Sequence, residues 1–336
     1  MIDAGPVTAE VLDPRTDPEP SYWGDLRSRA GLRADWAWSV LRVQSWSDRC
    51  PHLVTVLHGD DGPVGVVNAG WLGLPGRWRG FLPVGAKPRL GALHVRGPGS
   101  SAVPGWWVPG GVRTLLDYQR TMRAELGAGC LGAVLRQVTP AELSELDDRV
   151  LLSRLTEPIW RVDTAEMSDV DDWLRTLDKK RRSNLRVIGR KLADRVAVTI
   201  GPADSSTPAE ITELLRGNNA KYQGVLHNPV PQLTGYVEEL TSQADVVTFR
   251  YTDPDSGRLL GIGILMDHPE LPVWRTWAMV PVEEGGVRDL YFLHITRLIE
   301  WVTAHRRPAL LLGKGKGRLK SSVGATSIEQ YAALVR

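Results

Sequence analysis

Cysteine is nearly missing from this chain of 336 residues, which contains only Cys50 and Cys130. Two cysteines with no CxxC pair are too few for a disulfide framework and do not fit a cysteine-based zinc site. Long apolar runs are missing too, because no run reaches the ~18 residues that a membrane-spanning helix needs. We therefore expect a soluble protein of the reducing cytoplasm with no membrane span.

A large excess of one charge is also missing. Lysine and arginine number 41, aspartate and glutamate number 39, and the formal net charge is +2. An anionic partner must then be bound by local patches rather than by the field of the whole protein. This balance argues against a general nucleic-acid coat protein.

The length of the chain suits two domains of ordinary size, each with its own hydrophobic core. Residues 1–19 are rich in Pro, Asp and Glu and lack the basic start and apolar centre of a signal peptide. They are predicted to form a flexible tail.

The rest of the sequence repeats one order of elements. Residues 53–71 and 246–266 each indicate two strands joined by a turn that contains Asp and Gly. Each pair is followed by an aromatic-bearing strand, a long helix and a short apolar strand, predicted at 78–83, 112–126 and 130–137, and at 273–280, 287–304 and 309–312. The repetition predicts an α+β protein with two similar units, residues 20–155 and 156–336, each a twisted, mainly antiparallel sheet flanked by helices.

Two further helices are predicted between the repeated patterns. Thr139-Pro-Ala-Glu142 has an N-cap threonine, a first-turn proline and a glutamate that can bond back to the cap, and apolar spacing extends this helix to Leu155. The other helix covers residues 178–192, with Leu185 and Ile188 in one apolar stripe. Its remaining surface carries seven cations, which include Lys179, Lys180, Arg182, Arg186 and Arg190. Such a face is either solvated or a surface for phosphate groups.

The closing run Leu310–Lys320 indicates a buried strand followed by a loop with three glycines. The loop carries four cations and no carboxylate: Lys314, Lys316, Arg318 and Lys320. Glycine allows the backbone to approach a ligand closely, so the loop suits an anionic or carbonyl-bearing substrate. The alternative is a solvated basic turn.

These segments resemble a known family. The basic helix KKRRSNLRVIGRKL with Asn184, the segments NNAKYQG and TWAMVP, and the closing LLLGKGKGRLKSSVGA are similar to the acetyltransferase-like (GNAT) domain of Fem-type proteins. Lys320 stands before Gly324, as a lysine does before a glycine-containing segment in those relatives. The first half resembles the degenerate N-terminal GNAT copy of the same family, without a motif of its own. The resemblance implies a tandem-GNAT transferase that forms an amide bond with an aminoacyl group taken from charged tRNA, whereas other relatives use acyl-CoA.

The choice of donor depends on the loop before the last long helix. Ordinary GNAT proteins hold the pyrophosphate of coenzyme A with an Arg/Gln-x-x-Gly-x-Gly/Ala loop at a helix N-terminus. In this chain residues 280–291 have a different glycine spacing, and Glu283, Glu284 and Asp289 add negative charge. The sequence therefore favours aminoacyl-tRNA as the donor, with acyl-CoA as the alternative, since Arg288 can still meet a phosphate.

Either donor requires a group that takes a proton from the amine and a charge that stabilises the oxyanion. Lys320 and Lys316 are the candidates for the oxyanion or a donor phosphate, and Asp267 with His268, or His294, for the proton. Each of these proton acceptors also has a structural interpretation. No metal site is expected, because His58, His94, His227 and His305 lack ligand spacing.

The resemblance also assigns the two substrates to different residues. The donor would bind to Lys179, Lys180, Arg182, Arg186, Arg190 and Arg288, and the acceptor to Asn184, Tyr222 and Trp277. The predicted function is aminoacyl transfer from tRNA to an amine on a peptidoglycan precursor or natural-product intermediate, with no tightly bound cofactor. The alternatives are an acyl-CoA-dependent N-acyltransferase and a non-catalytic module that binds RNA or a peptide.

Overall fold

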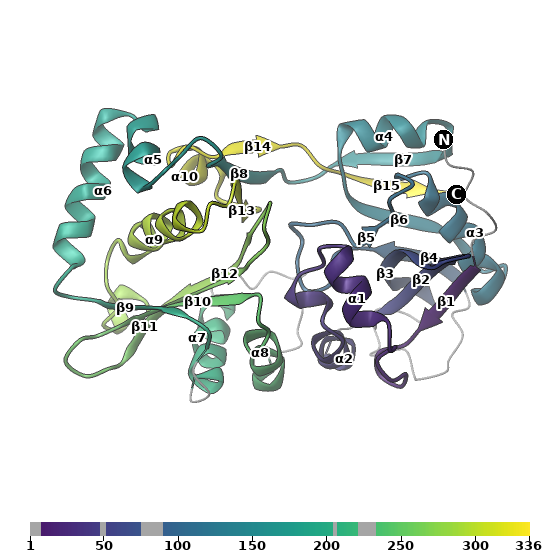
Figure 1. The fold of residues 1–336 in the computed structure, drawn as a ribbon, viewed down its shortest axis with the longest axis horizontal. Coiled ribbons are helices and arrows are strands. Elements are labelled where there is room, and N and C mark those ends of the chain that lie inside the picture. The colour runs from purple at the N-terminus through teal and green to yellow at the C-terminus, as the bar shows by residue number, and fades with distance from the viewer. Residues whose placement is uncertain (1–7, 48–51, 75–89, 204–206, 221–232) are drawn as a thin grey trace. The chain divides into compact units, whose positions relative to one another are not determined.

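The computed structural model describes residues 8–47, 52–74, 90–203, 207–220 and 233–336 (Figure 1). The chain divides into two compact units, Met1–Pro158 with Glu329–Arg336, and Ile159–Ile328. Each unit is a mainly antiparallel sheet with helices on it, and each has hydrophobic core clusters of its own. The predicted α+β class with two similar units is confirmed.

The sheet of the first unit has the strand order β1-β2-β3-β4-β6-β15-β7, with β5 paired to β3. All its pairs are antiparallel except β4 with β6. The strands are β1 (Thr8–Leu12), β2 (Leu53–Gly59), β3 (Gly62–Leu74), β4 (Leu90–Val95), β5 (Trp106–Trp107), β6 (Cys130–Val138), β7 (Val150–Leu155) and β15 (Tyr331–Val335). The helices are α1 (Trp23–Arg29), α2 (Trp38–Ser47), α3 (Thr114–Leu126) and α4 (Pro140–Leu146).

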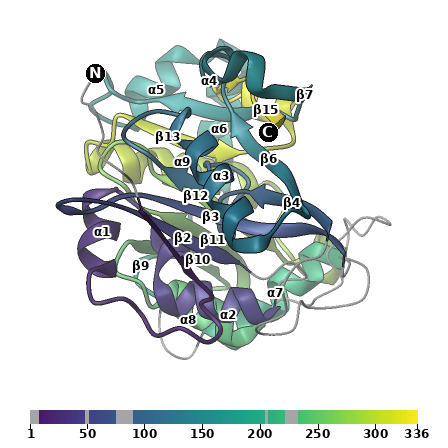
Figure 2. The same cartoon turned by 90° about the vertical axis from the view of Figure 1, so that its right-hand side faces the viewer.

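Alternation along β2 explains how the helices of the first unit cover both faces of its sheet (Figures 1 and 2). Val54 and Val56 pack in one cluster with α1 and α2, including Trp23 and Trp38. Thr55, which points to the opposite face, contacts the sulfur of Met122 in α3. Trp23 and Trp38 are therefore core residues, whereas Trp46 of α2 is exposed.

The second sheet has the order β14-β8-β13-β12-β11-β10-β9, and only β12 with β13 is a parallel pair. Its strands are β8 (Ile159–Asp163), β9 (Ala197–Gly201), β10 (Val246–Thr252), β11 (Leu259–Met266), β12 (Val273–Met279), β13 (Ala309–Gly313) and β14 (Thr326–Ile328). The helices are α5 (Val170–Thr176), α6 (Lys179–Leu192), α7 (Pro208–Ala220), α8 (Thr234–Thr241), α9 (Leu290–Ala304) and α10 (Gly317–Ser321).

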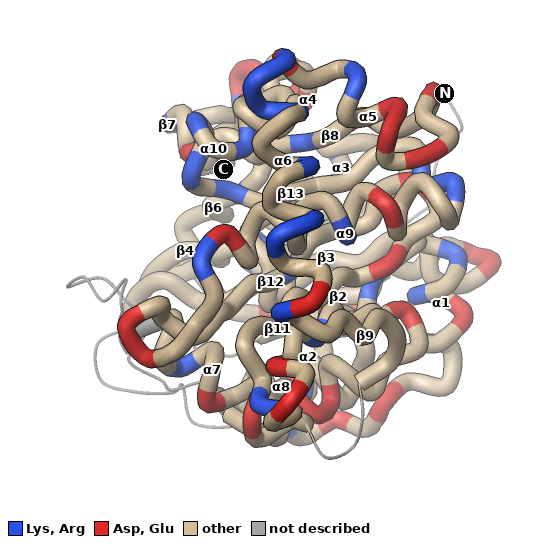
Figure 3. Tube along the Cα trace, turned by 90° about the vertical axis from the view of Figure 1, so that its left-hand side faces the viewer, with Lys and Arg blue, Asp and Glu red and all other residues tan. Residues whose placement is uncertain are grey.

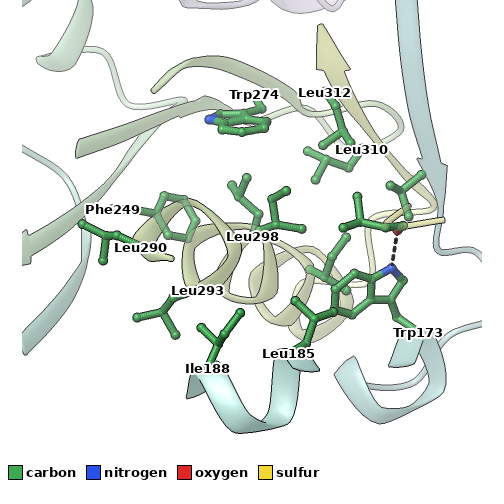
Figure 4. Close-up of a cluster of buried hydrophobic side chains, with 14 of the residues drawn as sticks. Trp173, Leu185, Ile188, Phe249, Trp274, Leu290, Leu293, Leu298, Leu310 and Leu312 are labelled. Atoms are coloured by element: carbon green, nitrogen blue, oxygen red, sulfur yellow. Dashed lines mark hydrogen bonds between the residues drawn. The ribbon is translucent and has the colours of Figure 1, made fainter. Parts of the chain in front are cut away.

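Helices α5, α6 and α9 cover one face of this sheet, and α7 and α8 cover the other (Figure 1). Figure 4 shows the core between α6 and α9, where Leu185 lies beside Trp173 and Ile188 lies near Leu293. The apolar stripe predicted for the basic helix is therefore buried, and its cations are left on the outer side. The indole of Trp173 in α5 fixes this layer by donating to the carbonyl oxygen of Val323 at 3.0 Å.

The two units share one order of elements. In the first, β2, β3 and β4 form a meander, and α3 crosses to the parallel strand β6. In the second, β10, β11 and β12 lead through α9 to the parallel strand β13. The repeat seen in the sequence is thus real, although the aromatic strand expected at 78–83 lies outside the described residues.

Each sheet also contains two strands that lie outside the repeated order of elements. Beyond the parallel pair, the first sheet continues with β15 and β7, and the second with β8 and β14. The chain therefore leaves the first unit after β7, enters the second as β8, and returns from β14 to complete the first sheet as β15. Residues 329–336, assigned to the second unit from the sequence, belong to the first.

Two other expectations need correction. Residues 8–12 are not part of a flexible tail, because they form β1 and pair with β2. The helix that starts at Thr139 has the expected capping box, with Glu142 N donating to Thr139 Oγ1 and Thr139 N to Glu142 Oε2, but it ends at Leu146. Residues 150–155 instead form β7, because pairing with β15 outweighs the helical spacing of their leucines.

Among the described residues, no helix has the length and apolar character needed to cross a membrane.

The exchange of β15 predicts how fragments behave. A fragment of residues 159–328 should fold alone, because it holds every strand of its sheet. A fragment of residues 1–158 should not, because it lacks β15, whose Ala333 and Val335 are fully buried. Thermal melting followed by circular dichroism, with amide NMR dispersion, measures both.

A linked variant provides the control. The backbone N–H of Thr156 donates to the carbonyl oxygen of Gln330 at 2.8 Å, so a short Gly/Ser linker can join Pro158 to Glu329. The linked chain should regain a cooperative melt. Cooperative melting of the unlinked 1–158 fragment would show that β15 is dispensable.

Candidate active site

The two parallel strands of the second unit separate almost as soon as they pair. Val273↔Leu311 is the pair that joins β12 to β13, whereas four pairs, from Gly91↔Cys130 to Val95↔Leu135, join β4 to β6 in the first unit. Backbone groups on the facing edges of β12 and β13 are thus left to bind something other than a strand. The carboxyl ends of parallel strands are also where ligands bind in many α/β sheets. We therefore take these two strand ends as the candidate active site.

One buried lysine holds the loop after β13. The ammonium of Lys320 donates to the carbonyl oxygens of Gly313 at 2.9 Å and Lys314 at 2.7 Å, and the residue is 4% exposed. It lies in α10 rather than in the surface loop that the sequence indicated. Because a buried charge needs partners, these carbonyl groups explain its burial. Lys320 thus positions the loop.

Lys316 is exposed and lies close to the candidate site. Its backbone is left-handed, with φ 51°, at the N-cap of α10. Its ammonium lies 5.7 Å from the ring centre of Tyr291, the second residue of α9. This places a positive charge beside the N-terminal turn of α9 and next to the end of β13. Of the two lysines singled out in the sequence, Lys316 is the one that can reach a substrate.

An aromatic cluster supports Trp277 in β12. The indole of Trp277 stacks on the imidazole of His294, with ring centres 4.3 Å apart and planes 12° apart. Tyr251 Oη and His294 Nδ1 share a hydrogen bond of 2.8 Å. Gly263 in β11 makes room, because a Cβ there would lie 2.1 Å from the imidazole. The packing of this cluster therefore holds the indole of Trp277, which borders the candidate site, in one orientation.

His294 remains uncharged in this cluster. It is fully buried, and burial lowers its pKa well below the usual range. Burial also raises the pKa of its partner Tyr251 well above the usual range. An imidazole out of reach of solvent, with Nδ1 already bonded, supports Trp277 rather than taking a proton from a substrate amine.

Asp267 lies at the wrong end of the sheet for this site. Met266, the residue before it, is paired with Val273 at the start of β12. Its carboxylate accepts two hydrogen bonds from the guanidinium of Arg307, at 3.0 and 2.6 Å. His268 Nδ1 accepts backbone N–H groups 3.1 Å away. The structure therefore does not bring Asp267 or His268 together with Lys316.

The cations predicted on α6 lie on its outer side, and two of them already bond to other groups of the protein. Arg186 pairs with Asp171 at 2.9 Å, and Arg182 donates to the carbonyl oxygen of Arg175 at 3.4 Å. Lys179, Lys180 and Arg190 are exposed and form no ion pair within the described part of the chain. Figure 3 shows these positions as Lys and Arg segments along α6, with more at α10.

Arg181 joins the two basic segments. It donates to the hydroxyl of Ser322, directly after α10. Its guanidinium also lies 4.7 Å from the ring centre of Phe292 in α9. The basic face of α6 therefore continues to the loop that carries Lys316. We call the exposed cations Lys179, Lys180, Arg190, Lys316 and Arg318 the basic face.

The loop before α9 has the opposite character. Glu283 and Glu284 are exposed, and Asp289 is the N-cap of α9 with a left-handed backbone, φ 69°, and no side-chain cap bond. Arg288 is exposed at the same helix end. Three acidic residues next to one arginine make this helix start a weak site for pyrophosphate.

The structure describes two of the three residues that the sequence analysis assigned to the acceptor. Asn184 is exposed on α6, Trp277 is half-buried in β12, and Tyr222 lies outside the described residues. No group of three or more His, Cys, Asp or Glu in the described chain is arranged to hold a metal ion.

Comparison with known proteins rests on structure. No family model matches the sequence, and no curated protein matches it. L-PGS from Bacillus licheniformis superposes with a TM-score of 0.64 at 10% identity, covering 95% of this chain and 92% of that one. The C-terminal domain of a putative lysylphosphatidylglycerol synthetase from Agrobacterium fabrum gives 0.59 at 12% identity, covering 93% and 90%. FemX gives 0.57 at 11% identity, covering 87% and 91%.

The chain has the fold of these three structures. At these identities the likeness establishes the fold of the two units and not an activity. Within this fold β12 and β13 part after one residue pair, whereas β4 and β6 stay paired over four. We therefore place the candidate site in the second unit.

The sequence analysis did not identify the residues that hold His294, Asp267 and the segment after α10 in place. Tyr251, Arg307 and Arg181 act through hydrogen bonds to residues 43, 40 and 141 positions away. For Tyr251 a signal exists, because Gly261 and Gly263 in a buried strand indicate a close approach by another group. Arg307 and Arg181 give no such signal.

Lys320 should matter for stability. Lys320→Ala leaves two carbonyl oxygens without their donor and opens a cavity, so we expect a loss of about 2–4 kcal/mol in the free energy of unfolding. Lys316→Ala, an exposed neighbour in the same segment, should change it by less than about 0.5 kcal/mol. Urea unfolding of both variants provides the measurement. Equal small effects would mean that the buried ammonium is not structural.

Gly263 should be intolerant of a methyl group. Gly263→Ala forces the Cβ into the imidazole of His294, and we expect a loss of about 1–3 kcal/mol. Gly189→Ala, in the interior of α6 with nothing within 4 Å of the added atom, should gain roughly 0.5–1 kcal/mol from helix propensity. Opposite shifts in the urea midpoint are expected, and a neutral Gly263→Ala would contradict the packing of the aromatic cluster.

Proposed function

We propose that the chain is an aminoacyltransferase that takes an aminoacyl group from aminoacyl-tRNA and joins it to an amine as an amide. The observation that carries the proposal is the basic face, which runs from α6 to the loop beside the diverging ends of β12 and β13. A donor with many phosphates at one end and a reactive carbonyl at the other matches such an arrangement.

The charges of the basic face suit a polyanion. Lys179, Lys180 and Arg190 are exposed on a 14-residue helix and are not neutralised by ion pairs within the described chain. Cations of this kind bind phosphates along a nucleic-acid backbone and release counterions. The charged surface extends past the open strand ends, so phosphates can be held at a distance from the reacting carbonyl.

The helix start that would hold coenzyme A is acidic. Glu283 and Glu284 are exposed in the loop before α9, and Asp289 is the N-cap. Negative side chains repel a pyrophosphate at the position where helix N–H groups would otherwise attract it. This favours aminoacyl-tRNA over acyl-CoA as the donor.

The reaction has simple requirements. The uncharged amine nitrogen attacks the ester carbonyl carbon, the new C–N bond forms, and the C–O bond to the terminal ribose breaks. The amine gives up one proton, and the ribose oxygen takes one up. In this proposal Lys316 stabilises the developing oxyanion or a phosphate. Lys320 holds the loop that carries Lys316.

The names of two similar structures support the proposal. One is the C-terminal domain of a putative lysylphosphatidylglycerol synthetase and the other is FemX. The acceptor proposed here is an amine, such as one on a peptidoglycan precursor or natural-product intermediate. The decisive experiment incubates the protein with a pool of charged tRNA and, separately, with a panel of acyl-CoA thioesters, each with a mixture of amines. Transfer from tRNA alone is expected, and transfer from acyl-CoA alone would overturn the choice of donor.

Binding of tRNA should depend on the exposed cations of α6. Lys180→Ala with Arg190→Ala should weaken binding and reduce the slope of log affinity against log salt by about one for each phosphate that the variant no longer neutralises. The measurement is fluorescence anisotropy of labelled tRNA at several salt concentrations.

The matched control is Arg120→Ala, an exposed arginine on α3 of the first unit that pairs with Asp117. It removes the same type of charge and should leave both affinity and slope unchanged. Equal effects of the control and the double variant would mean that the basic face is solvated and does not bind tRNA.

A further inference from the structure

A cavity of about 400 Å³ lies at the end of β12, on the face of the sheet covered by α7 (Figure 1). This volume falls within the range of small-molecule sites, about 300–1,000 Å³. Its apolar lining comes from α7, the start of β11 and the end of β12: Leu214, Gly217, Leu259, Met279, Val280 and Pro281. Its polar lining consists of Glu210, Glu213, Asn218, Arg258 and Glu284.

The polar lining carries net negative charge. Glu213 and Glu284 form no ion pair within the described chain, and Glu210 has only a distant one, 3.9 Å from Arg250. Arg258, the cation of the lining, donates to the backbone carbonyl oxygen of Glu284 at 2.8 Å. Three carboxylates and one arginine beside the apolar side chains of Leu214, Leu259 and Met279 fit a ligand with a positive group on a short apolar chain.

The cavity is joined to the candidate active site through β12. The amide of Asn218 donates to the backbone carbonyl oxygen of Trp277 at 3.3 Å. Two residues further along, Met279 lines the cavity. The same strand end therefore borders the cavity on the α7 face and carries the supported indole of Trp277.

We propose that this cavity binds a primary ammonium group carried on an apolar chain. The inference rests on the proposed function and names the substrate class within it. The bound ammonium is a recognition group, because the nitrogen that attacks a carbonyl must be uncharged. Two sources supply this chemistry: a second amine on the acceptor, and the side chain of a basic aminoacyl group on the donor.

The test measures direct binding to the full chain by isothermal titration calorimetry, without a donor. The probes are 1,5-diaminopentane and, as a neutral match of equal length, 1,5-pentanediol. The diamine should bind at least about tenfold more tightly, and Glu213→Gln with Glu284→Gln should weaken it about fivefold to tenfold. Glu283→Gln, the adjacent exposed carboxylate outside the lining, is the control and should change nothing. Equal binding of the two probes, or no effect of the double variant, would overturn the proposal.

A second pair of probes separates the two sources. L-lysine amide and L-norleucine amide represent aminoacyl groups with and without the side-chain ammonium. A preference for lysine amide over the diamine assigns the cavity to the donor's aminoacyl group, and the reverse preference assigns it to the acceptor. If neither the diamine nor lysine amide binds better than its match without the terminal ammonium group, the proposal fails.

Failure here is distinguishable from failure of the proposed function. Binding of the ammonium probes needs no tRNA, so a positive result stands even if no aminoacyl transfer is detected. Transfer from charged tRNA that is unaffected by Glu213→Gln with Glu284→Gln, for basic and neutral substrates alike, would leave the function intact and remove the cavity from it.

Discussion

The single pair Val273↔Leu311 sets the geometry on which the candidate site depends. Two parallel strands joined by a buried helix normally continue as a ladder, as β4 and β6 do in the first unit. In the second unit the strands part after this pair, so their backbone groups no longer pair with each other. Trp277 and the Lys316 loop then stand at the two strand ends, one supported by the aromatic cluster and the other by Lys320.

The arginines and lysines of the second unit divide into two groups by their partners. Lys320, Arg307, Arg186 and Arg181 are bonded to carbonyl, carboxylate or hydroxyl oxygens and hold local structure. Lys179, Lys180, Arg190 and Lys316 are exposed. A charge held by protein oxygens stabilises one conformation, whereas an exposed charge is available to phosphates. The basic face is therefore smaller than the count of cations suggests, and Arg181 links its α6 part to the segment after α10.

The chain passes from the first unit to the second and returns to the first as β15. The first sheet is therefore not complete until residues 329–336 have been synthesised. The second unit holds all its strands in one continuous segment. The two units thus share an order of elements but differ in how their folding depends on the rest of the sequence.

The sequence by itself determined the repeated strand, helix and strand pattern, the buried stripe of α6 and the capping box at Thr139. These features depend on spacing between near neighbours, which periodicity and cap chemistry report directly. Only the tertiary structure decided that residues 150–155 form a strand, that Lys320 is buried, and that Asp267 lies at the opposite end of β12 from the site. Each of these depends on a partner that is distant in sequence: β15 for β7, the end of β13 for Lys320, and the register of β11 against β12 for Asp267. Hydrogen bonds and strand register between distant segments leave no periodic mark on either segment, because the free energy of the interaction arises only when folding brings the two together.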